Sequence, residues 1–533
     1  TLYNLGKVKE IWHQQLPPEN FCKLRVLKID ECHNLIIVLP SNLRESLRNL
    51  EELSVESCDL VEEICELEGL VVKQGREAVP LPKIRELKLW RLPKLILMNK
   101  WWNKGPHGFL SLQNLKRLKI YKCNNLRNLF SSWATKGLSQ LQYLEVESCE
   151  MMKEIVTTER AEEEEAIDKI VFPQLRTLQL LNLQKLTSFY QENHTSETLT
   201  IEECPRVKIF VSSGCPDTEN LKASDEGFEA EMDQKSSLST ITRPPLFNEK
   251  VLPLTTLEEL TLRNLNNIKE IWQRQLPLQN FCRLRVLKIG VFHNLITVIP
   301  SNLQQRLQNL EELSIGGCDL VEKVWELEGL LVDEGHETVA LPQIRELRLW
   351  GLPRLMNMWW NKGPGGVLSL HNLKSLRISK CNSLKNLFSL SASKGLIQLK
   401  VLYIESCEMM KEIVATEIQG EEEEATADTI VFRQLRTLEL KNMPELVCVF
   451  QGNFTLEWPS LKNLRIEHCP KMRTFVSSGC LEAENLKESG DKGFEEKLDV
   501  EGKLVGITQP PFFNEKVLLP TLKELRIYSL QSL

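Results

Sequence analysis

The sequence lacks the features that mark membrane spans, nucleic-acid binding and catalysis. Among its 533 residues, no apolar run approaches the ~18 residues of a membrane span, and the first residues lack the basic-then-apolar layout of a signal peptide. A net charge of −7 and a pI near 5.9 argue against a general attraction to nucleic acid or anionic lipid. Phosphate-binding loops, hydrolase nucleophile elbows and paired zinc-binding histidines are absent. The sequence therefore predicts no enzyme and no catalytic, cofactor-binding or metal site.

Repetition is what the sequence has in quantity. "FCKLRVLKIDECHNL" at Phe21 returns as "FCRLRVLKIGVFHNL" at Phe281, and the match continues on both sides, so two similar blocks make up most of the chain. Inside each block, apolar residues recur at intervals of two and three, as at Leu24, Leu27, Ile29, Cys32 and Leu35. This spacing is typical of leucine-rich repeats. Further units start at Leu50, Ile84, Leu115, Leu141, Leu175, Leu257, Leu284, Leu310, Ile344, Leu373, Leu399, Leu435, Leu461 and Leu522.

The repeat unit predicts a fold of the α/β class, a curved leucine-rich-repeat solenoid. Alternation in "RVLKI" places Leu27 and Ile29 on one face of a short strand and Lys28 on the other. A single unit cannot bury its own apolar face, so neighbouring units must stack. We expect one parallel sheet on the inner face, with irregular loops and short helices outside.

Two polar segments interrupt the repeats and define the predicted domains. We expect a first block of repeats at 1–210, a polar linker or extruded loop at 211–250, a second block at 251–475, a polar loop at 476–516 and the start of a truncated repeat at 517–533. The opening "TLYNLGKVKEIW" matches "TLRNLNNIKEIW" at Thr261, in the middle of a block. We therefore expect the chain to be a fragment of a longer protein.

Cysteine is abundant, and most of it follows the repeat. Of 15 cysteines, nine occupy the position just after the predicted strand, where a small buried side chain fits. No Cys-x-x-Cys pair accompanies them, which argues against metal or redox chemistry. We expect these thiols to be reduced and structural. They are Cys32, Cys58, Cys123, Cys149, Cys204, Cys318, Cys381, Cys407 and Cys469.

The wording of the units resembles one family. "LEELSVESCDLVEEI", "LQYLEVESCEMMKEIV" and "VFPQLRTLQLLNLQKL" look like the C-terminal leucine-rich repeats of plant intracellular disease-resistance proteins of the coiled-coil, nucleotide-binding type. The resemblance covers essentially the whole chain. It implies a cytoplasmic immune receptor whose repeats recognise a pathogen effector or a guarded host protein, or contact the receptor's own nucleotide-binding domain. Nucleotide is expected only in a domain upstream of this chain.

Two other classes are alternatives to the receptor. An extracellular receptor would carry a signal peptide, Asn at the ladder position and paired cap cysteines, which this sequence does not show. The substrate-recognition repeats of an F-box ubiquitin ligase remain open, because the defining domain could lie upstream of Thr1. Neither nucleic acid nor a membrane span is expected as a partner or anchor.

Exposed strand positions supply the candidate binding surface. The middle position of several strands is basic, and the position two residues later carries Trp90, Tyr121 and Trp350. An exposed aromatic side chain beside a cation is typical of protein interaction hot spots. Stabilising contacts with neighbouring side chains are the alternative role for these aromatics. The candidate partner-binding residues are Lys88, Trp90, Lys119, Tyr121, Arg348, Trp350 and Arg377.

Overall fold

The structure is a computed structural model that describes most of the repeats. The chain divides into two compact parts, called unit 1 and unit 2. Unit 1 comprises Thr1–Leu295 with Asn302–Leu310, and unit 2 comprises Ile296–Ser301 with Glu311–Leu533. The described residues are 1–12, 16–17, 19–40, 43, 46–65, 83–95, 113–131, 138–157, 172–190, 196–207, 209–211, 245–247, 254–273, 276, 279–303, 306–326, 344–358, 370–389, 392–393, 395–415, 429–451, 455–477 and 511–530.

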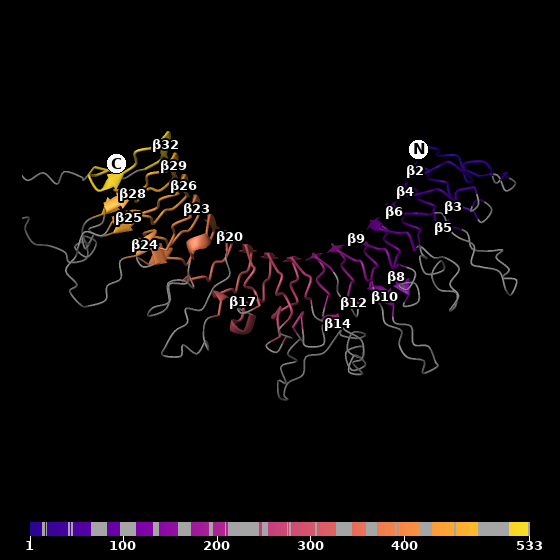
Figure 1. Ribbon diagram of the computed structural model, residues 1–533, viewed down its shortest axis with the longest axis horizontal. Coiled ribbons are helices and arrows are strands. Elements are labelled where there is room, and N and C mark those ends of the chain that lie inside the picture. Colours follow the sequence, from indigo (N-terminus) through magenta and orange to yellow (C-terminus); the bar gives the residue numbers. More distant parts are fainter. Residues whose placement is uncertain are drawn as a thin grey trace, which may run out of the picture. The chain divides into compact units, whose positions relative to one another are not determined.

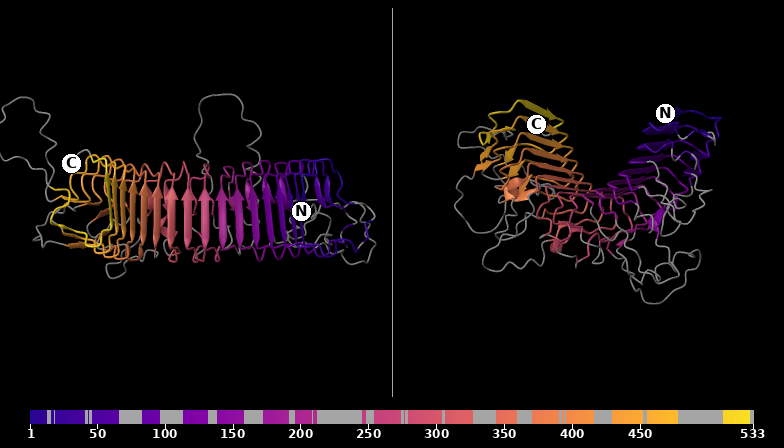
Figure 2. Two further views of the ribbon diagram at one scale, coloured as in Figure 1. Left: turned by 90° about the horizontal axis from the view of Figure 1, so that it is seen from above. Right: turned by 45° about the vertical axis from the view of Figure 1, so that its right-hand side comes forward.

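Each unit is built on a ladder of short parallel strands, one from each repeat (Figures 1 and 2). In unit 1 the ladder strands are β1 (Leu2–Tyr3), β2 (Val26–Asp30), β4 (Glu52–Glu56), β6 (Glu86–Trp90), β7 (Arg117–Tyr121), β9 (Tyr143–Glu147), β11 (Thr177–Leu181), β13 (Thr198–Glu202), β15 (Glu259–Arg263) and β16 (Val286–Gly290). In unit 2 they are β18 (Glu312–Gly316), β20 (Glu346–Trp350), β21 (Ser375–Ser379), β23 (Val401–Glu405), β26 (Thr437–Lys441), β29 (Asn463–Glu467) and β32 (Glu524–Tyr528). The predicted leucine-rich-repeat solenoid is confirmed.

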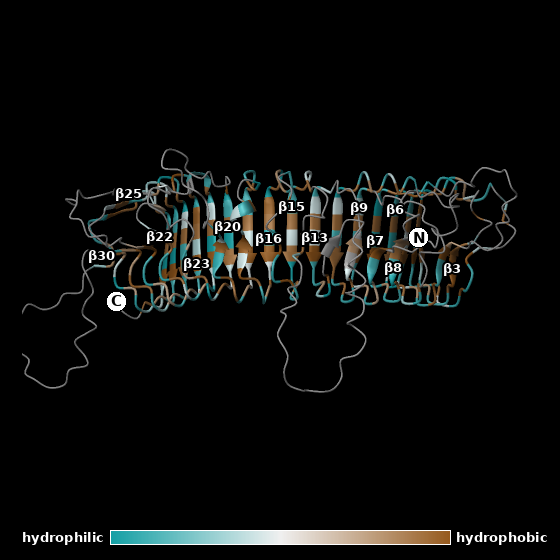
Figure 3. Ribbon diagram, turned by 90° about the horizontal axis from the view of Figure 1, so that it is seen from below, coloured by the Kyte–Doolittle hydropathy of each residue, from teal (hydrophilic) through white to brown (hydrophobic). Residues whose placement is uncertain are grey.

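Alternation along each strand creates the core. In β7, Leu118 and Ile120 are buried, whereas the residues between and beside them face solvent. Leu118 pairs in register with Leu87 of β6 and Leu144 of β9, so equivalent side chains stack from one repeat to the next. Figure 3 shows this alternation as bands of hydrophobic and hydrophilic residues along the ladder strands. Stacking therefore buries a continuous apolar row that no single repeat could bury alone.

A repeated turn ends the ladder strands. The residue after the strand has a positive φ, as at Ser57 (49°) and Lys122 (51°), and its N–H donates to the carbonyl of the last residue in the next strand. Left-handed backbone is unfavourable for residues other than glycine, so this hydrogen bond helps to offset its free-energy cost.

The cysteine that follows the turn is buried, as predicted. The Cys58 thiol donates to the carbonyl of Glu56 at 3.0 Å, and the other eight ladder cysteines make the same contact with the last residue of their own strands. Burial raises the pKa of the thiols of Cys58, Cys149 and Cys204 to about 12, and secondary effects come from nearby backbone and charges. These side chains therefore behave as small apolar groups at neutral pH.

Short strands outside the ladder form further small parallel sheets, where the sequence predicted loops and short helices. They pair with their counterparts in the next repeat, which satisfies backbone groups that a loop would leave to water. In unit 1 they are β3 (Ile37–Leu39), β5 (Glu63–Cys65), β8 (Asn128–Ser131), β10 (Glu154–Thr157), β12 (Ser188–Tyr190) and β14 (Ile209–Val211). In unit 2 they are β17 (Thr297–Ile299), β19 (Lys323–Trp325), β22 (Phe388–Ser389), β24 (Val414–Ala415), β25 (Thr429–Val431), β27 (Phe450–Gln451), β28 (Thr455–Glu457), β30 (Val476–Ser477) and β31 (Val517–Leu518). Two 3-10 helices, η3 (Ser301–Leu303) and η5 (Leu370–Asn372), are also described.

The two polar segments at 211–250 and 476–516 lie largely outside the described residues. Strands on either side of the first segment are direct neighbours, because β13 and β15 pair in register over their whole length. The same holds for β29 and β32 around the second segment. At the end of the first segment, Phe247 is fully buried against Trp272 and Phe281. The ladder therefore continues past both segments within its own unit.

Candidate functional site

The structure gathers the seven predicted contact residues into two clusters. Lys88 and Trp90 of β6 lie directly beside Lys119 and Tyr121 of β7, because the two strands pair residue by residue. The remaining three, Arg348, Trp350 and Arg377, form a corresponding cluster on β20 and β21 of unit 2. All seven side chains are exposed or half-buried, as the alternation predicted.

Carboxylates neutralise part of the basic row in unit 1. Lys88 forms an ion pair of 2.9 Å with Glu86 of its own strand, and Lys119 forms one of 2.9 Å with Glu145 of β9. Lys119 also lies over the ring of Tyr143, with Nζ 4.9 Å from the ring centroid. The basic row therefore lies on a surface of mixed charge. The sequence analysis considered only the middle position of each strand and did not predict the carboxylates beside it.

Tyr143 connects this cluster to the next strands. Its hydroxyl donates to Glu145 at 2.7 Å and lies 3.1 Å from Oε1 of Gln179. Burial raises the pKa of the Tyr143 hydroxyl, and the hydrogen bond to Glu145 raises it further. Tyr143 therefore stays protonated and holds Glu145 in position beside Lys119.

Trp90 and Tyr121 form an aromatic pair on the solvent side. Their ring centroids lie 5.6 Å apart at an angle of 57°, and 38% of Trp90 remains exposed. Lys122, in the turn after β7, lies 5.1 Å from the centroid of the Tyr121 ring. Such an aromatic pair can bury an apolar group of a partner, while the cation beside it contacts a carboxylate of the same partner.

The corresponding cluster in unit 2 is arranged differently. Trp350 is half-buried and lies over Gly316 of the adjacent β18, where an added Cβ would overlap the indole ring. Arg348 pairs with Glu346 at 3.0 Å, and Arg377 lies 5.8 Å from the centroid of the Tyr403 ring. For Trp350, the structure therefore supports the role of packing against a neighbouring strand.

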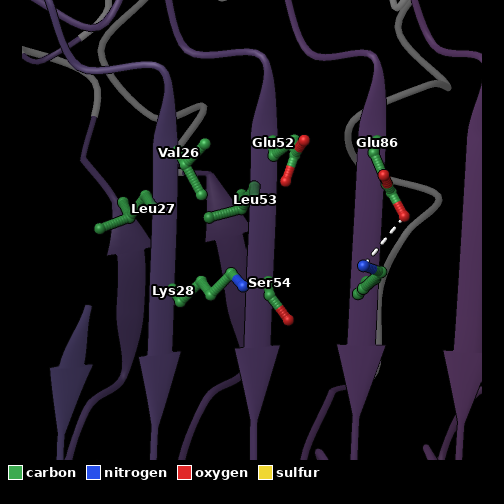
Figure 4. Close-up of a pocket in the computed structure, with 8 residues that line it drawn as sticks. Val26, Leu27, Lys28, Glu52, Leu53, Ser54 and Glu86 are labelled. Atoms are coloured by element: carbon green, nitrogen blue, oxygen red, sulfur yellow. Dashed lines mark ion pairs between the residues drawn. The ribbon is translucent and has the colours of Figure 1, made fainter.

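A shallow depression lies beside the first cluster, over Ser54 of β4 (Figure 4). Lys28 and Lys88 flank it, with Glu52 and Glu86 at its edge, because serine is shorter than the lysines on either side. The volume enclosed between these side chains is about 10 Å³, and the rest of the depression is open to solvent. Cofactor pockets usually measure roughly 300–1,000 Å³, so the depression is a shallow surface feature and not a cofactor pocket.

Reasoning from the sequence missed three exposed cations around the aromatic pair. Arg117 begins β7, and Arg91 and Lys122 occupy the turns after β6 and β7. Each of the three lies within two residues of a predicted contact residue, so the sequence alone could have indicated them. In the described part of the chain, no group of three or more metal-ligating side chains occurs, and no helix has the length and apolarity of a membrane span.

The chain is similar to plant disease resistance proteins. The family model described as "Plant disease resistance protein RPS2-like, leucine-rich repeats" matches residues 2–150, 135–222, 256–408 and 398–488. The disease resistance protein RPS5 of Arabidopsis thaliana is 27% identical over 247 residues, which cover 41% of this chain and 26% of RPS5. SUMM2 of the same plant is 33% identical over 104 residues, covering 20% of this chain and 11% of SUMM2.

The match to these curated relatives thus spans about a quarter of their length or less. Among solved structures, a leucine-rich-repeat protein of Leptospira interrogans aligns with a TM-score of 0.22 and 15% identity, covering 73% of this chain and 99% of that protein.

Proposed function

Because the chain belongs to the leucine-rich-repeat family of RPS2-like plant disease resistance proteins, we propose that it is the recognition region of a cytoplasmic plant immune receptor. In this role it binds a pathogen effector or a guarded host protein. It also helps to keep the receptor inactive through contact with the receptor's own nucleotide-binding domain. Nucleotide binds to that domain, and the repeats carry no catalytic step.

The observation that carries this proposal is the exposed Trp90–Tyr121 pair. Most side chains on the solvent side of the ladder in unit 1 are polar, so a half-exposed indole that packs at a tilt against a phenol is unusual there. Aromatic side chains with a fixed orientation lose little conformational entropy on binding and bury a large area, which makes them frequent hot spots.

The strand framework supports a binding role in a second way. Residues of β6 and β7 are fixed by backbone pairing on both sides and by the buried Leu87 and Leu118 beneath them. A partner therefore meets a preorganised surface, which lowers the entropic cost of association. The family match also favours the receptor over an F-box ubiquitin ligase.

Two variants in the full-length receptor test the proposal. Trp90→Ala removes the exposed ring, and Lys119→Glu reverses a charge beside it, while neither touches the core. We expect altered partner binding or loss of repression with an unchanged melting temperature. Thr200→Glu, at the same solvent-facing row on β13, is the control and should leave binding and repression normal. Normal partner binding and normal repression in both test variants would refute a contact at this surface.

A further inference from the structure

The solvent side of unit 1 has a localised charge pattern centred on β6 and β7. These two strands and the first residues of their turns carry five cations and one carboxylate, Glu86, at exposed or half-buried positions. The flanking strands β4 and β9, counted in the same way, carry two carboxylates each and no cation. A narrow basic strip therefore lies between two acidic borders. Its cations are Lys88, Arg91, Arg117, Lys119 and Lys122.

Three of these cations are available to a partner. Lys88 and Lys119 already have carboxylate partners in Glu86 and Glu145. Arg91, Arg117 and Lys122 are exposed, and no carboxylate of the described residues lies within ion-pair distance of them. They lie at the two ends of the strip, since Arg117 begins β7 and the other two follow Trp90 and Tyr121 in the turns.

The dimensions of the strip limit what it can bind. Neighbouring strands are about 4.8 Å apart, and six residues of a strand extend about 20 Å, so the strip is long in the strand direction and only two strands wide. Glu52, Glu56, Glu145 and Glu147 on the borders repel any anion that extends sideways. A single extended peptide segment fits this space, whereas a nucleic-acid duplex would place phosphates over the acidic borders.

We propose that the strip binds an acidic, extended segment of a protein partner, which runs along the strand direction. This proposal rests on the proposed function. An apolar or aromatic side chain of this segment packs on Trp90 and Tyr121. Its carboxylates bind Arg91 and Lys122 at one end of the strip and Arg117 at the other.

The related cluster in unit 2 does not provide the same site. Trp350 is directed onto Gly316 of the neighbouring strand. Gly351, Ser375 and Ser379 stand where unit 1 has Arg91, Arg117 and Tyr121. Three of the groups that would hold the acidic segment are thus missing, and the indole already packs against its own chain. Of these two clusters, the one on β6 and β7 alone presents this site.

Peptide binding to the 533-residue chain tests the proposal. The probe is the fluorescein-labelled peptide Gly-Glu-Asp-Phe-Glu-Asp-Gly, followed by fluorescence anisotropy. We expect binding that weakens as salt rises from 50 to 500 mM, because exposed charges are screened. Replacing the four acidic residues by their amides, or the Phe by Ser, should weaken binding at least about fivefold, the scale of one exposed charged contact.

The chain offers a closely matched pair of variants. Lys122 and Lys380 are both exposed, occupy the same turn position and have nearly equal φ angles of 51° and 52°. We expect Lys122→Glu to weaken peptide binding about fivefold or more, and Lys380→Glu to change it less than twofold. Equal effects of the two substitutions would overturn the proposal, as would equal binding of the amide peptide.

A single-stranded oligonucleotide of equal charge separates the two kinds of polyanion. Tighter binding of the oligonucleotide than of the peptide, lost in Lys122→Glu, would overturn a protein partner at this strip. Failure of this inference is distinguishable from failure of the proposed function. If the peptide does not bind while Trp90→Ala still alters the receptor, only the acidic-segment proposal is refuted. If the peptide binds while Trp90→Ala and Lys119→Glu leave the receptor normal, the surface's role in the receptor is refuted instead.

Discussion

The indole ring of Trp350 lies over the backbone of Gly316 in the neighbouring strand, in space that any side chain at position 316 would occupy. The equivalent tryptophan in the first block, Trp90, has Glu56 opposite it and contacts Tyr121 instead. Identical residues at equivalent strand positions therefore have different surroundings, and this difference separates a packing residue from a candidate contact residue.

Gly316→Ala should destabilise unit 2, because the new methyl group forces the Trp350 ring to move. We expect the free energy of unfolding to fall by about 1–3 kcal/mol, the usual range for overpacking, in denaturant titrations. In a Trp350→Ala background the same substitution should cost less, giving a coupling of at least about 0.5 kcal/mol. Additive effects of the two substitutions would contradict the packing of Trp350 on Gly316.

Leu118→Asp should disrupt the stacked core of unit 1. Leu118 is fully buried between Leu87 and Leu144, so an aspartate there would place an unpaired charge among apolar side chains. We expect a loss of about 4 kcal/mol or more, seen as a large drop in melting temperature. Arg117→Asp, one residue earlier on the solvent side, is the control and should shift stability by about 0.5 kcal/mol or less. An unchanged melting temperature for Leu118→Asp would show that the strand register is wrong.

Native alkylation should separate the cysteines by burial. Cys22 and Cys282 are half-buried, whereas the nine ladder cysteines are buried, so iodoacetamide at pH 8 should label the first two and leave the ladder unlabelled. Full labelling is expected only in denaturant, and mass spectrometry of proteolytic peptides measures both. Extensive labelling of Cys149 or Cys204 in the folded chain would contradict the buried ladder. Quantitative disulfides between Cys381 and Cys407 in protein from its own cells would contradict a cytoplasmic location.

Stability should fall at alkaline pH because of the same thiols. Folding raises the pKa of Cys58, Cys149 and Cys204 to about 12, whereas the pKa of a thiol in the unfolded chain is about 8.5. The folded state therefore holds more protons above about pH 8.5, and the stabilisation present below that pH is lost as the pH rises toward 12. We expect urea titrations at pH 8 and pH 10 to show this decrease. Cys204→Ala should make the decrease smaller, and an unchanged slope would count against the prediction.

Glu412→Gln should be neutral or stabilising at pH 7. One carboxylate oxygen of Glu412 is buried without a hydrogen-bond partner among the described residues, and burial raises the pKa of the carboxyl group. The raised pKa means that the stabilisation from the protonated form is present at low pH and lost as the pH rises through the folded-state pKa. Thermal unfolding at pH 7 and pH 4 should show the advantage of the amide shrinking on acidification. A variant clearly less stable than the parent at pH 7 would contradict a burial penalty.

Much of the candidate surface could be predicted because alternation along a strand decides which side chains point outward. Lys88, Trp90, Lys119 and Tyr121 were placed on the solvent side from spacing alone, and the parallel pairing of β6 and β7 brings them together. The ion pair of Lys119 with Glu145 was not predicted, since it depends on rotamers and on which strand lies next to β7.

The intervals between apolar residues determined the strands, the buried rows and the cysteine ladder, because burial at Leu118 or Cys149 follows from a period that is local to each repeat. Tertiary structure alone decided what faces those strands. It brought β13 beside β15 across a long polar segment, and it set Gly316 against Trp350 but Glu56 against Trp90. Such pairings join residues that are far apart in the chain, and their energies depend on side-chain volume and charge at the point of contact, which no periodicity within one repeat contains.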